Sequence, residues 1–385
     1  MAYEPVTRPL TSREAFQETS DTAALSQAAV LLLLGNQLRG DAQLLQARAA
    51  TAARGAVAGP LPEEDQAELE VPQLRLTGER FSLQQVQSGL QQHGLKVRMT
   101  LAATPKEPVA ADTLAAIADR LHQSPEPATA AELMEASLQS PQELTRVAAA
   151  SSYIELSTEP VRPLKVLERG TQSTDSLVRE VAATALTRHY PESPALRKLT
   201  RKTRPSTGGK PSHTSLIVHG TFARNESWWQ PGGDFHSYLR QNVRPDLYSA
   251  GDRFEWSGAY SDGARAIAAT DLRAWVNKHN LNGLDLFAHS HGGNIAMLAS
   301  QGGLSIGTLV LLSCPVHVDK YFPAFDRVRK VVSIRVKVDL VILADGGGQR
   351  FSDPRIQENV LPLWFNHSAT HDPKVWRKYN VPAML

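Results

Sequence analysis

The sequence predicts an α/β fold with a parallel sheet, preceded by a mainly α-helical region. In the C-terminal half, short apolar strand-like runs alternate with stretches of helical periodicity, the pattern of a parallel sheet. Before residue 203 the chain is rich in Ala, Leu and Gln and has helical periodicity. The stretch TRPSTGGKPSH at 203–213 lacks apolar periodicity and is typical of a linker.

Length, charge and cysteine content narrow the class of protein. The 385 residues are enough for two or three domains, and 41 basic against 39 acidic side chains give no nucleic-acid-binding footprint. The single cysteine, Cys314, lies in an apolar run and is expected to be a core thiol in a reducing compartment. The N-terminus has no secretory pattern, and the apolar run at 28–34 is too short to span a bilayer. We therefore expect a cytoplasmic protein without a membrane span.

The first part of the chain, residues 1–105, is expected to be partly helical. Apolar periodicity predicts a helix over 21–50, and an acidic stretch at 61–70 separates it from a second helix at 82–92. The alternating residues at 95–101 favour a strand. No function follows from this region.

Residues 106–202 contain an internal repeat. The stretch LTRVAAASSYIEL begins at residue 144 and LVREVAATALTRHY at 177, so that Arg146 and Arg179 occupy matching places 33 residues apart. A fainter copy starts at 112–121. Pairs of short helices at this period resemble HEAT-type repeats, which stack and often present a surface to a protein partner. An irregular helical bundle is the alternative.

The remaining residues, 214–385, are expected to form the sheet domain. The predicted helices cover 234–243, 262–279 and 373–380. On the helix at 262–279, one apolar face contains Ala264, Ile267, Ala268, Leu272, Trp275 and Val276. The predicted strands cover 215–220, 253–258, 284–289, 308–313, 331–338 and 359–365. In such a sheet, the functional site lies at the carboxyl ends of the strands.

A serine occupies the turn between a predicted strand and a predicted helix. In LDLFAHSHGGNIAMLA, at 284–299, Ser290 follows the strand and precedes two glycines that allow close packing of helix and strand. The residues around it read Ala-His-Ser-His-Gly, one small-residue change from the G-x-S-x-G pattern of a nucleophile. The alternative is a serine that only caps a helix.

A serine nucleophile needs a base and a carboxylate, and both follow Ser290 in the order Ser, Asp, His. Asp339 is the favoured acid because it stands where a late strand should end, with Asp345 and Asp319 in reserve. The stretch FNHSATHDP offers two bases, and His367 is favoured over His371 because it directly follows the last predicted strand.

A serine nucleophile that takes part in acyl transfer attacks a carbonyl carbon, and the carbonyl oxygen then becomes an oxyanion. This oxyanion needs hydrogen-bond donors. We expect these to be the backbone N–H groups of His291, just past the serine, and of Thr221, in the loop VHGTF. His219 and Gly220 are expected to support that loop. Metal binding by the His-x-His pair around Ser290 would need further ligands, so we expect neither a metal nor a cofactor.

Four stretches carry a resemblance to a known family. They are VHGTFARNESWWQPGGDFHSYL, FEWSGAYSDGARAIAATDL, LDLFAHSHGGNIAMLA and NHSATHDPKVW, within 212–382. Together they resemble the successive blocks of lipase- and esterase-like α/β-hydrolases. The resemblance implies hydrolysis of carboxylic esters, on a small-molecule or lipid substrate, through an acyl-serine intermediate. The competing hypotheses are a non-catalytic helical-repeat scaffold with a hydrolase-like recognition module, and an acyltransferase that uses the same triad.

Overall fold

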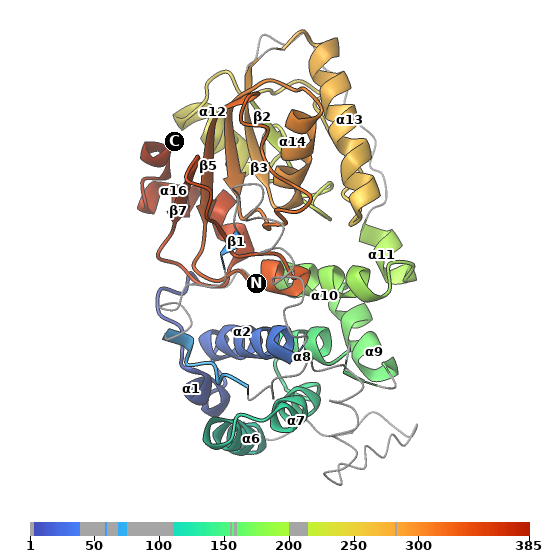
Figure 1. Ribbon diagram of the computed structural model, residues 1–385, viewed down its shortest axis with the longest axis vertical. Coiled ribbons are helices and arrows are strands. Elements are labelled where there is room, and N and C mark those ends of the chain that lie inside the picture. The colour runs from blue at the N-terminus through green and yellow to red at the C-terminus, as the bar shows by residue number, and fades with distance from the viewer. Residues whose placement is uncertain are drawn as a thin grey trace.

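A computed structural model of the protein describes residues 4–38, 58–59, 68–74, 111–154, 156–157, 160–199, 215–281 and 283–385. The elements form a helical part and a sheet part, one above the other (Figure 1). The helical part contains α1 (Ser12–Gln17), α2 (Asp21–Leu38), α6 (Ala111–Gln123), α7 (Pro127–Ser137), α8 (Glu143–Tyr153), α9 (Val161–Gly170), α10 (Ser176–His189) and α11 (Pro194–Leu199). The sheet part contains β2 (Ser215–Val218), α12 (Asp234–Asn242), α13 (Asp262–Lys278), β3 (Leu284–His289), α14 (His291–Gln301), β4 (Ile306–Leu312), β5 (Val328–Arg335), α15 (Leu340–Asp345), β6 (Arg350–Phe351), β7 (Ile356–Val360), the 3-10 helix η1 (His367–His371), α16 (Pro373–Lys378) and a second 3-10 helix, η2 (Val381–Met384).

Five strands form one sheet in the order β2-β3-β4-β5-β7, and every neighbouring pair is parallel. Parallel strands need crossover connections. Here α12 and α13 lie between β2 and β3, α14 lies between β3 and β4, and α15 lies between β5 and β7. All carboxyl ends of the strands therefore lie at one edge of the sheet. A separate two-residue strand, β1 (Ala58–Gly59), pairs antiparallel with β6. The predicted α/β class with a helical N-terminal half is confirmed.

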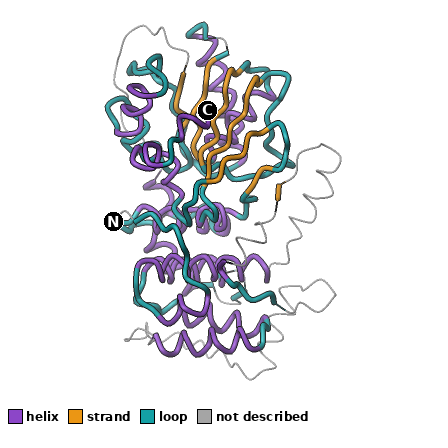
Figure 2. The backbone as a smooth tube through the Cα atoms, turned by 90° about the vertical axis from the view of Figure 1, so that its left-hand side faces the viewer, coloured by secondary structure: helices purple, strands orange, loops and turns teal. Residues whose placement is uncertain are grey.

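Helices cover both faces of the sheet, and each face has its own apolar core. Side chains alternate between the two faces along a strand. In β2, Leu216 and Val218 pack into the core under α13 and α14, whereas Ile217 packs into the core under α12 and α16. The tube view separates these helical layers from the strands between them (Figure 2). Burial on both faces explains why the strand sequences are almost continuously apolar.

The two copies of the internal repeat have the same local structure. Arg146 in α8 donates from Nη1 to the carbonyl of Ser140 at 2.7 Å, and Arg179 in α10 donates in the same way to Ser173 at 2.9 Å. Each of the two helices is followed by a shorter one, α9 or α11. The matched arginines thus tie each helix to the loop that precedes it. The assignment to the HEAT type stays a prediction.

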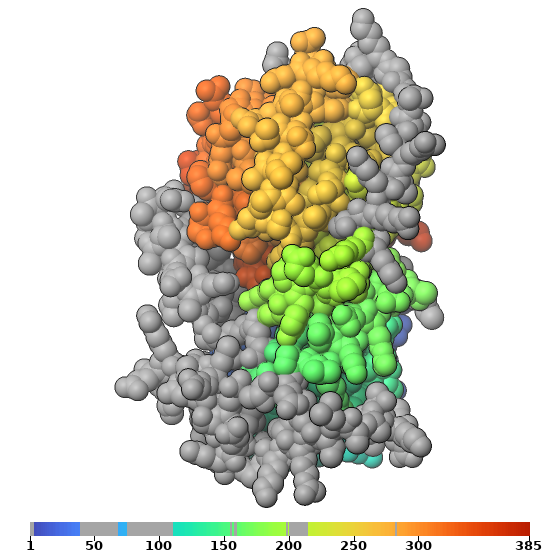
Figure 3. Space-filling model, turned by 90° about the vertical axis from the view of Figure 1, so that its right-hand side faces the viewer, coloured from blue at the N-terminus to red at the C-terminus, as the bar shows by residue number. Residues whose placement is uncertain are grey.

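A third apolar core joins the helical part to the sheet part. It contains α2, α8 and α10 residues such as Leu31 and Val181, and it extends to Val341 and Phe365 from the sheet part. A fully buried aliphatic side chain contributes about 1.5–3 kcal/mol relative to an exposed one, so this shared core is a substantial link. Seen from the side, the green surface of the helical part meets the yellow surface of α13 and its surroundings (Figure 3).

Some predicted elements differ from the structure. Residues 253–258 form no strand; Phe254 and Trp256 are buried there, but the nearby backbone bridge to β2 is a single one, between Leu247 and Ser215. The apolar alternation reflected burial in an extended loop. On α13, Ile267 is 65% exposed, and the buried face instead includes Arg265.

The last two strands begin earlier than predicted. The strand expected at 331–338 is β5, and the one expected at 359–365 is β7, both shifted toward the N-terminus. The apolar residues beyond them are buried in loops that lead to the site.

Some predictions lie outside the described residues. They are the linker at 203–213, the helix at 82–92, the strand at 95–101 and the end of the helix at 21–50. In the described parts of the chain, no helix combines the length and apolar character needed to cross a membrane.

Candidate active site

Ser290 lies on a strained turn between β3 and α14. Its backbone has φ 53° and ψ −134°, in the positive-φ region that a non-glycine residue rarely occupies. Small neighbours make this turn possible: a Cβ on Gly220 would lie 2.7 Å from Cβ of Ser290, and one on Gly292 would lie 2.5 Å from the carbonyl oxygen of Val218. Such strain clusters at functional sites, and the turn has the geometry of a nucleophile elbow.

Ser290 opens into a cavity at the carboxyl ends of the strands. The cavity is walled by residues from both parts of the chain, so it lies where the helical part meets the sheet. Its lining residues are Glu180, Thr184, Thr221, Phe222, Ala223, Trp228, His289, Ser290, His291, Pro315, Val341, Ile342, Asp345, His367 and His371.

Asp339 and His367 form a buried hydrogen-bonded pair. Nδ1–H of His367 donates to Oδ2 of Asp339 at 2.7 Å, which leaves Nε2 as the basic nitrogen of the neutral ring. Burial lowers the pKa of His367, but the charges of Asp339, Glu180 and Asp345 and the hydrogen bond outweigh it and raise the pKa above its usual value. The other oxygen of Asp339 accepts from the N–H groups of Val341 and Ile342 and so caps α15.

His371 has different neighbours. Its ring stacks on Trp228 with the ring centroids 4.0 Å apart and meets the edge of His289 at 4.6 Å. Burial and the nearby imidazole of His367 lower the pKa of His371 to about 3, so its ring is neutral. Both histidines line the cavity, but the carboxylate of Asp339 bonds to His367.

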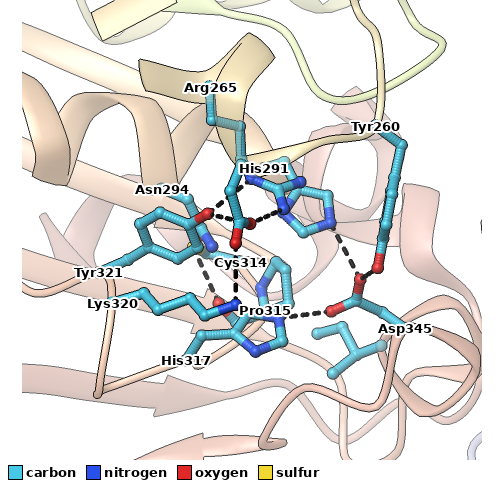
Figure 4. A network of polar contacts seen from close by, with 12 residues as sticks. Tyr260, Arg265, His291, Asn294, Cys314, Pro315, His317, Lys320, Tyr321 and Asp345 are labelled. Atoms are coloured by element: carbon cyan, nitrogen blue, oxygen red, sulfur yellow. Dashed lines mark hydrogen bonds and ion pairs between the residues drawn. The ribbon is translucent and has the colours of Figure 1, made fainter. Parts of the chain in front are cut away.

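Asp345 is the centre of a second buried network (Figure 4). It accepts from Nε2 of His291 at 3.1 Å, from Nε2 of His317 at 2.6 Å and from the hydroxyl of Tyr260. Burial raises the pKa of Asp345, but His291 and His317 outweigh it and hold this pKa well below its usual value. Asp345 therefore fixes the ring of the residue after the serine and does not bond to His367. The other reserve, Asp319, is exposed and does not line the cavity.

The loop after β2 lies against the serine turn. His219 is fully buried between Trp229 and Trp256, and its Nδ1–H donates to the carbonyl of Gly220 at 2.9 Å. Burial lowers the pKa of His219 to about 3. Next in the chain, Thr221 lines the cavity. The neutral imidazole thus braces the loop on which the first expected oxyanion donor lies.

The second expected oxyanion donor is the N–H of His291. His291 is the first residue of α14, where backbone N–H groups have no acceptor within the helix. The helix dipole adds positive potential at this end. Burial lowers the pKa of the His291 side chain to about 4, so the ring that bonds to Asp345 is neutral.

The two adjacent tryptophans occupy different positions. Trp228 lines the cavity, whereas Trp229 is buried beside it and donates from Nε1 to the carbonyl of Ala223 at 2.8 Å.

Cys314 is fully buried, and its thiol bonds to Oδ1 of Asn294 at 2.9 Å. Burial raises its pKa to about 12. It is the core thiol that the sequence predicts. Within the described residues, no three His, Cys, Asp or Glu side chains form a metal-binding group.

Sequence reasoning missed the cavity residues contributed by the helical part. Glu180 and Thr184 lie one turn apart on α10 and both line the cavity. The only signal was a polar pair four residues apart within an Ala-rich helix, which reads equally well as a solvated face. The partners of Asp345, Tyr260 and His317, were also missed.

Comparison with known proteins agrees with this geometry. Residues 216–384 match the alpha/beta hydrolase family. Taken with the parallel sheet, the match supports an α/β-hydrolase domain in the C-terminal region. No curated protein and no solved structure matches the chain.

Proposed function

We propose that the protein is a serine hydrolase that cleaves carboxylic esters. The observation that carries the proposal is the bond between Nδ1 of His367 and Asp339, in the same cavity as the strained Ser290. A serine hydroxyl is a weak nucleophile unless a base accepts its proton and a third group orients that base. The three side chains supply these roles in the chain order typical of this fold.

In the proposed first half-reaction, Oγ of Ser290 attacks the ester carbonyl carbon while Nε2 of His367 accepts the hydroxyl proton. The carbonyl oxygen becomes an oxyanion, which the N–H groups of Thr221 and His291 stabilise. As the tetrahedral intermediate collapses, the imidazolium returns the proton to the departing alcohol and leaves an acyl-serine. The charge of Asp339 stabilises the imidazolium at each stage.

In the second half-reaction, water attacks the acyl-serine and His367 accepts a proton from that water. Collapse of the second intermediate releases the carboxylic acid and restores the serine hydroxyl. Transfer of the acyl group to an acceptor other than water would use the same residues. That alternative differs from hydrolysis only in the second half-reaction.

The test combines turnover with covalent labelling. We expect wild-type protein to hydrolyse short 4-nitrophenyl esters and to react with a fluorophosphonate probe at Ser290. Ser290→Ala should lose both, with turnover reduced by about 10³-fold or more. Ser313→Ala is a matched control, because Ser313 is a buried serine that does not line the cavity.

Two results would contradict the proposal. Equal ester turnover by wild type and Ser290→Ala would exclude Ser290 as the nucleophile. Folded wild-type protein that takes no label would favour the hypothesis of a non-catalytic scaffold. Product analysis with an added alcohol separates hydrolysis from acyl transfer.

A further inference from the structure

Glu180 introduces a carboxylate into the cavity from the helical part of the chain. It lies on α10, in a segment outside the matched hydrolase region, yet it shares the cavity wall with Ser290 and His367. Its Oε2 atom is buried and has no hydrogen-bond partner among the residues that the structure describes. A buried acceptor without a donor is unfavourable, so a bound molecule that supplies the donor would be stabilised at this place.

The other charges of the cavity favour a cationic donor. The lining residues include no lysine or arginine. Burial lowers the pKa values of His289, His291 and His371, so these rings carry no positive charge at neutral pH. The fourth lining histidine, His367, has a raised pKa, but it bonds to the carboxylate of Asp339, which balances its charge when it is protonated. The second lining carboxylate, Asp345, already accepts from three donors. Glu180 is therefore the lining carboxylate with an unmet acceptor atom.

The surroundings of Glu180 allow its carboxyl group to ionise when a cation binds beside it. Burial raises the pKa of its carboxyl to about 7, with Glu226 and Asp339 acting in the same direction and His367 and Arg179 in the opposite one. A bound cation would favour the carboxylate form. The apolar and aromatic side chains in the wall, including Trp228 and Phe222, suit the carbon chain of a ligand and can contribute a cation–π attraction.

We propose that Glu180 binds a protonated amine of the substrate, so that the enzyme selects esters that carry an ammonium group. This inference rests on the proposed hydrolysis at Ser290 and names its substrate class. The helical part is then a specificity element of the site. Glu180 acts on binding and orientation and takes no part in the bond changes at the ester.

The test compares esters that differ only in ammonium against methyl, at pH 8. One pair places the group on the acyl side: 4-nitrophenyl 6-aminohexanoate and 4-nitrophenyl heptanoate. The other pair places it on the alcohol side: 4-aminobutyl butyrate and pentyl butyrate. Wild type should prefer the ammonium ester in kcat/KM in one of the pairs. Glu180→Gln, which keeps the size of the side chain but removes its charge, should reduce that preference by about 10- to 100-fold.

Glu192→Gln is the control, because it removes one carboxylate charge just as Glu180→Gln does. Glu192 is exposed on the helical part and does not line the cavity. This variant should keep the wild-type preference. The inference is overturned if wild type prefers the methyl ester in both pairs, or if Glu180→Gln keeps the preference for the ammonium ester.

A binding measurement separates this inference from the proposed function. Calorimetry should detect hexylammonium binding to wild type that is at least about 10-fold weaker in Glu180→Gln, with 1-hexanol as the neutral comparison. If no ester is hydrolysed but this difference is present, ester hydrolysis fails and Glu180 still binds ammonium. If esters are hydrolysed but the ammonium binds both proteins equally, hydrolysis stands and the role of Glu180 is overturned.

Discussion

Asp339 bonds to His367 with one carboxylate oxygen and caps α15 with the other. The distance from Oδ2 to Nδ1 of His367 is 2.7 Å, and Oδ1 accepts from the N–H groups of Val341 and Ile342 at 3.0 and 3.2 Å. The same side chain therefore fixes both the imidazole and the start of the helix that packs against the helical part. The two roles can be separated by substitution.

Asp339→Asn should reduce kcat strongly while leaving the protein folded. The amide oxygen of asparagine can still cap α15, but its NH₂ group would face Nδ1 of His367 and favour the wrong tautomer. We expect a loss of about 10⁴-fold in kcat. Ester turnover measures the expected loss of kcat, and thermal unfolding of the same preparations checks that the protein stays folded. Asp339→Ala should lose stability as well, and an Asn variant with wild-type turnover would contradict the role of Asp339.

The two histidines of η1 should differ in their effects. His367→Ala is expected to lose nearly as much turnover as Ser290→Ala, because the members of a triad act as a unit. His371→Ala removes a ring that stacks on Trp228 but bonds to no described carboxylate, so it should retain a measurable fraction of the activity. Steady-state kinetics of the two variants decide between them. An inactive His371→Ala beside an active His367→Ala would show that the base is His371.

The close approach of Gly220 to the serine turn gives a steric prediction. Gly220→Ala would place a Cβ 2.7 Å from Cβ of Ser290, so the loop or the turn must shift. We expect fluorophosphonate labelling to fall by more than about 10-fold, because a shift of the loop also moves the proposed oxyanion donor. Gly263→Ala is the matched control, since its nearest atom would be 4.0 Å away in the first turn of α13. Equal labelling of the two variants would refute the argument.

Features of the fold that depend on residues adjacent in sequence could be predicted, whereas features that depend on tertiary packing could not. The turn at Ser290 was predictable because strand, serine and glycines are adjacent in sequence. Residues 253–258 were misread because burial of Phe254 and Trp256 produces the same alternation as a strand. Glu180 was missed because it precedes Ser290 by more than 100 residues, and only tertiary packing brings the two into one cavity. The catalytic roles and the domain boundaries stay predictions.

The buried neutral histidines predict instability in acid. Burial lowers the pKa of His219 and His371 to about 3 and that of His291 to about 4. The unfolded chain then binds more protons than the folded one between about pH 4 and 6.5, so the free energy of unfolding should fall as the pH drops through that window. Each histidine contributes up to about 1.4 kcal/mol per pH unit. Glu180, whose carboxyl pKa burial raises to about 7, opposes the trend in the upper part of this window. His367, whose pKa is raised, affects the slope only above about pH 6.5.

Urea unfolding at a series of pH values measures this slope. His219→Phe keeps a ring between Trp229 and Trp256 but cannot titrate, so its slope below pH 6 should be shallower than that of wild type by about one proton's contribution. The absolute stability of the variant is also expected to change, because the bond to Gly220 is lost. An unchanged slope would show that His219 does not contribute.

The core shared by α2, α8, α10 and α15 has a consequence for where the chain can be cut. The family match begins at residue 216, but Val341, Leu343 and Phe365 of the matched region are buried together with helices that precede it. A fragment trimmed to the matched region would expose these side chains to water and lose Glu180 and Thr184 from the cavity. The region that matches the family and the set of residues that share one buried core therefore have different boundaries in this protein.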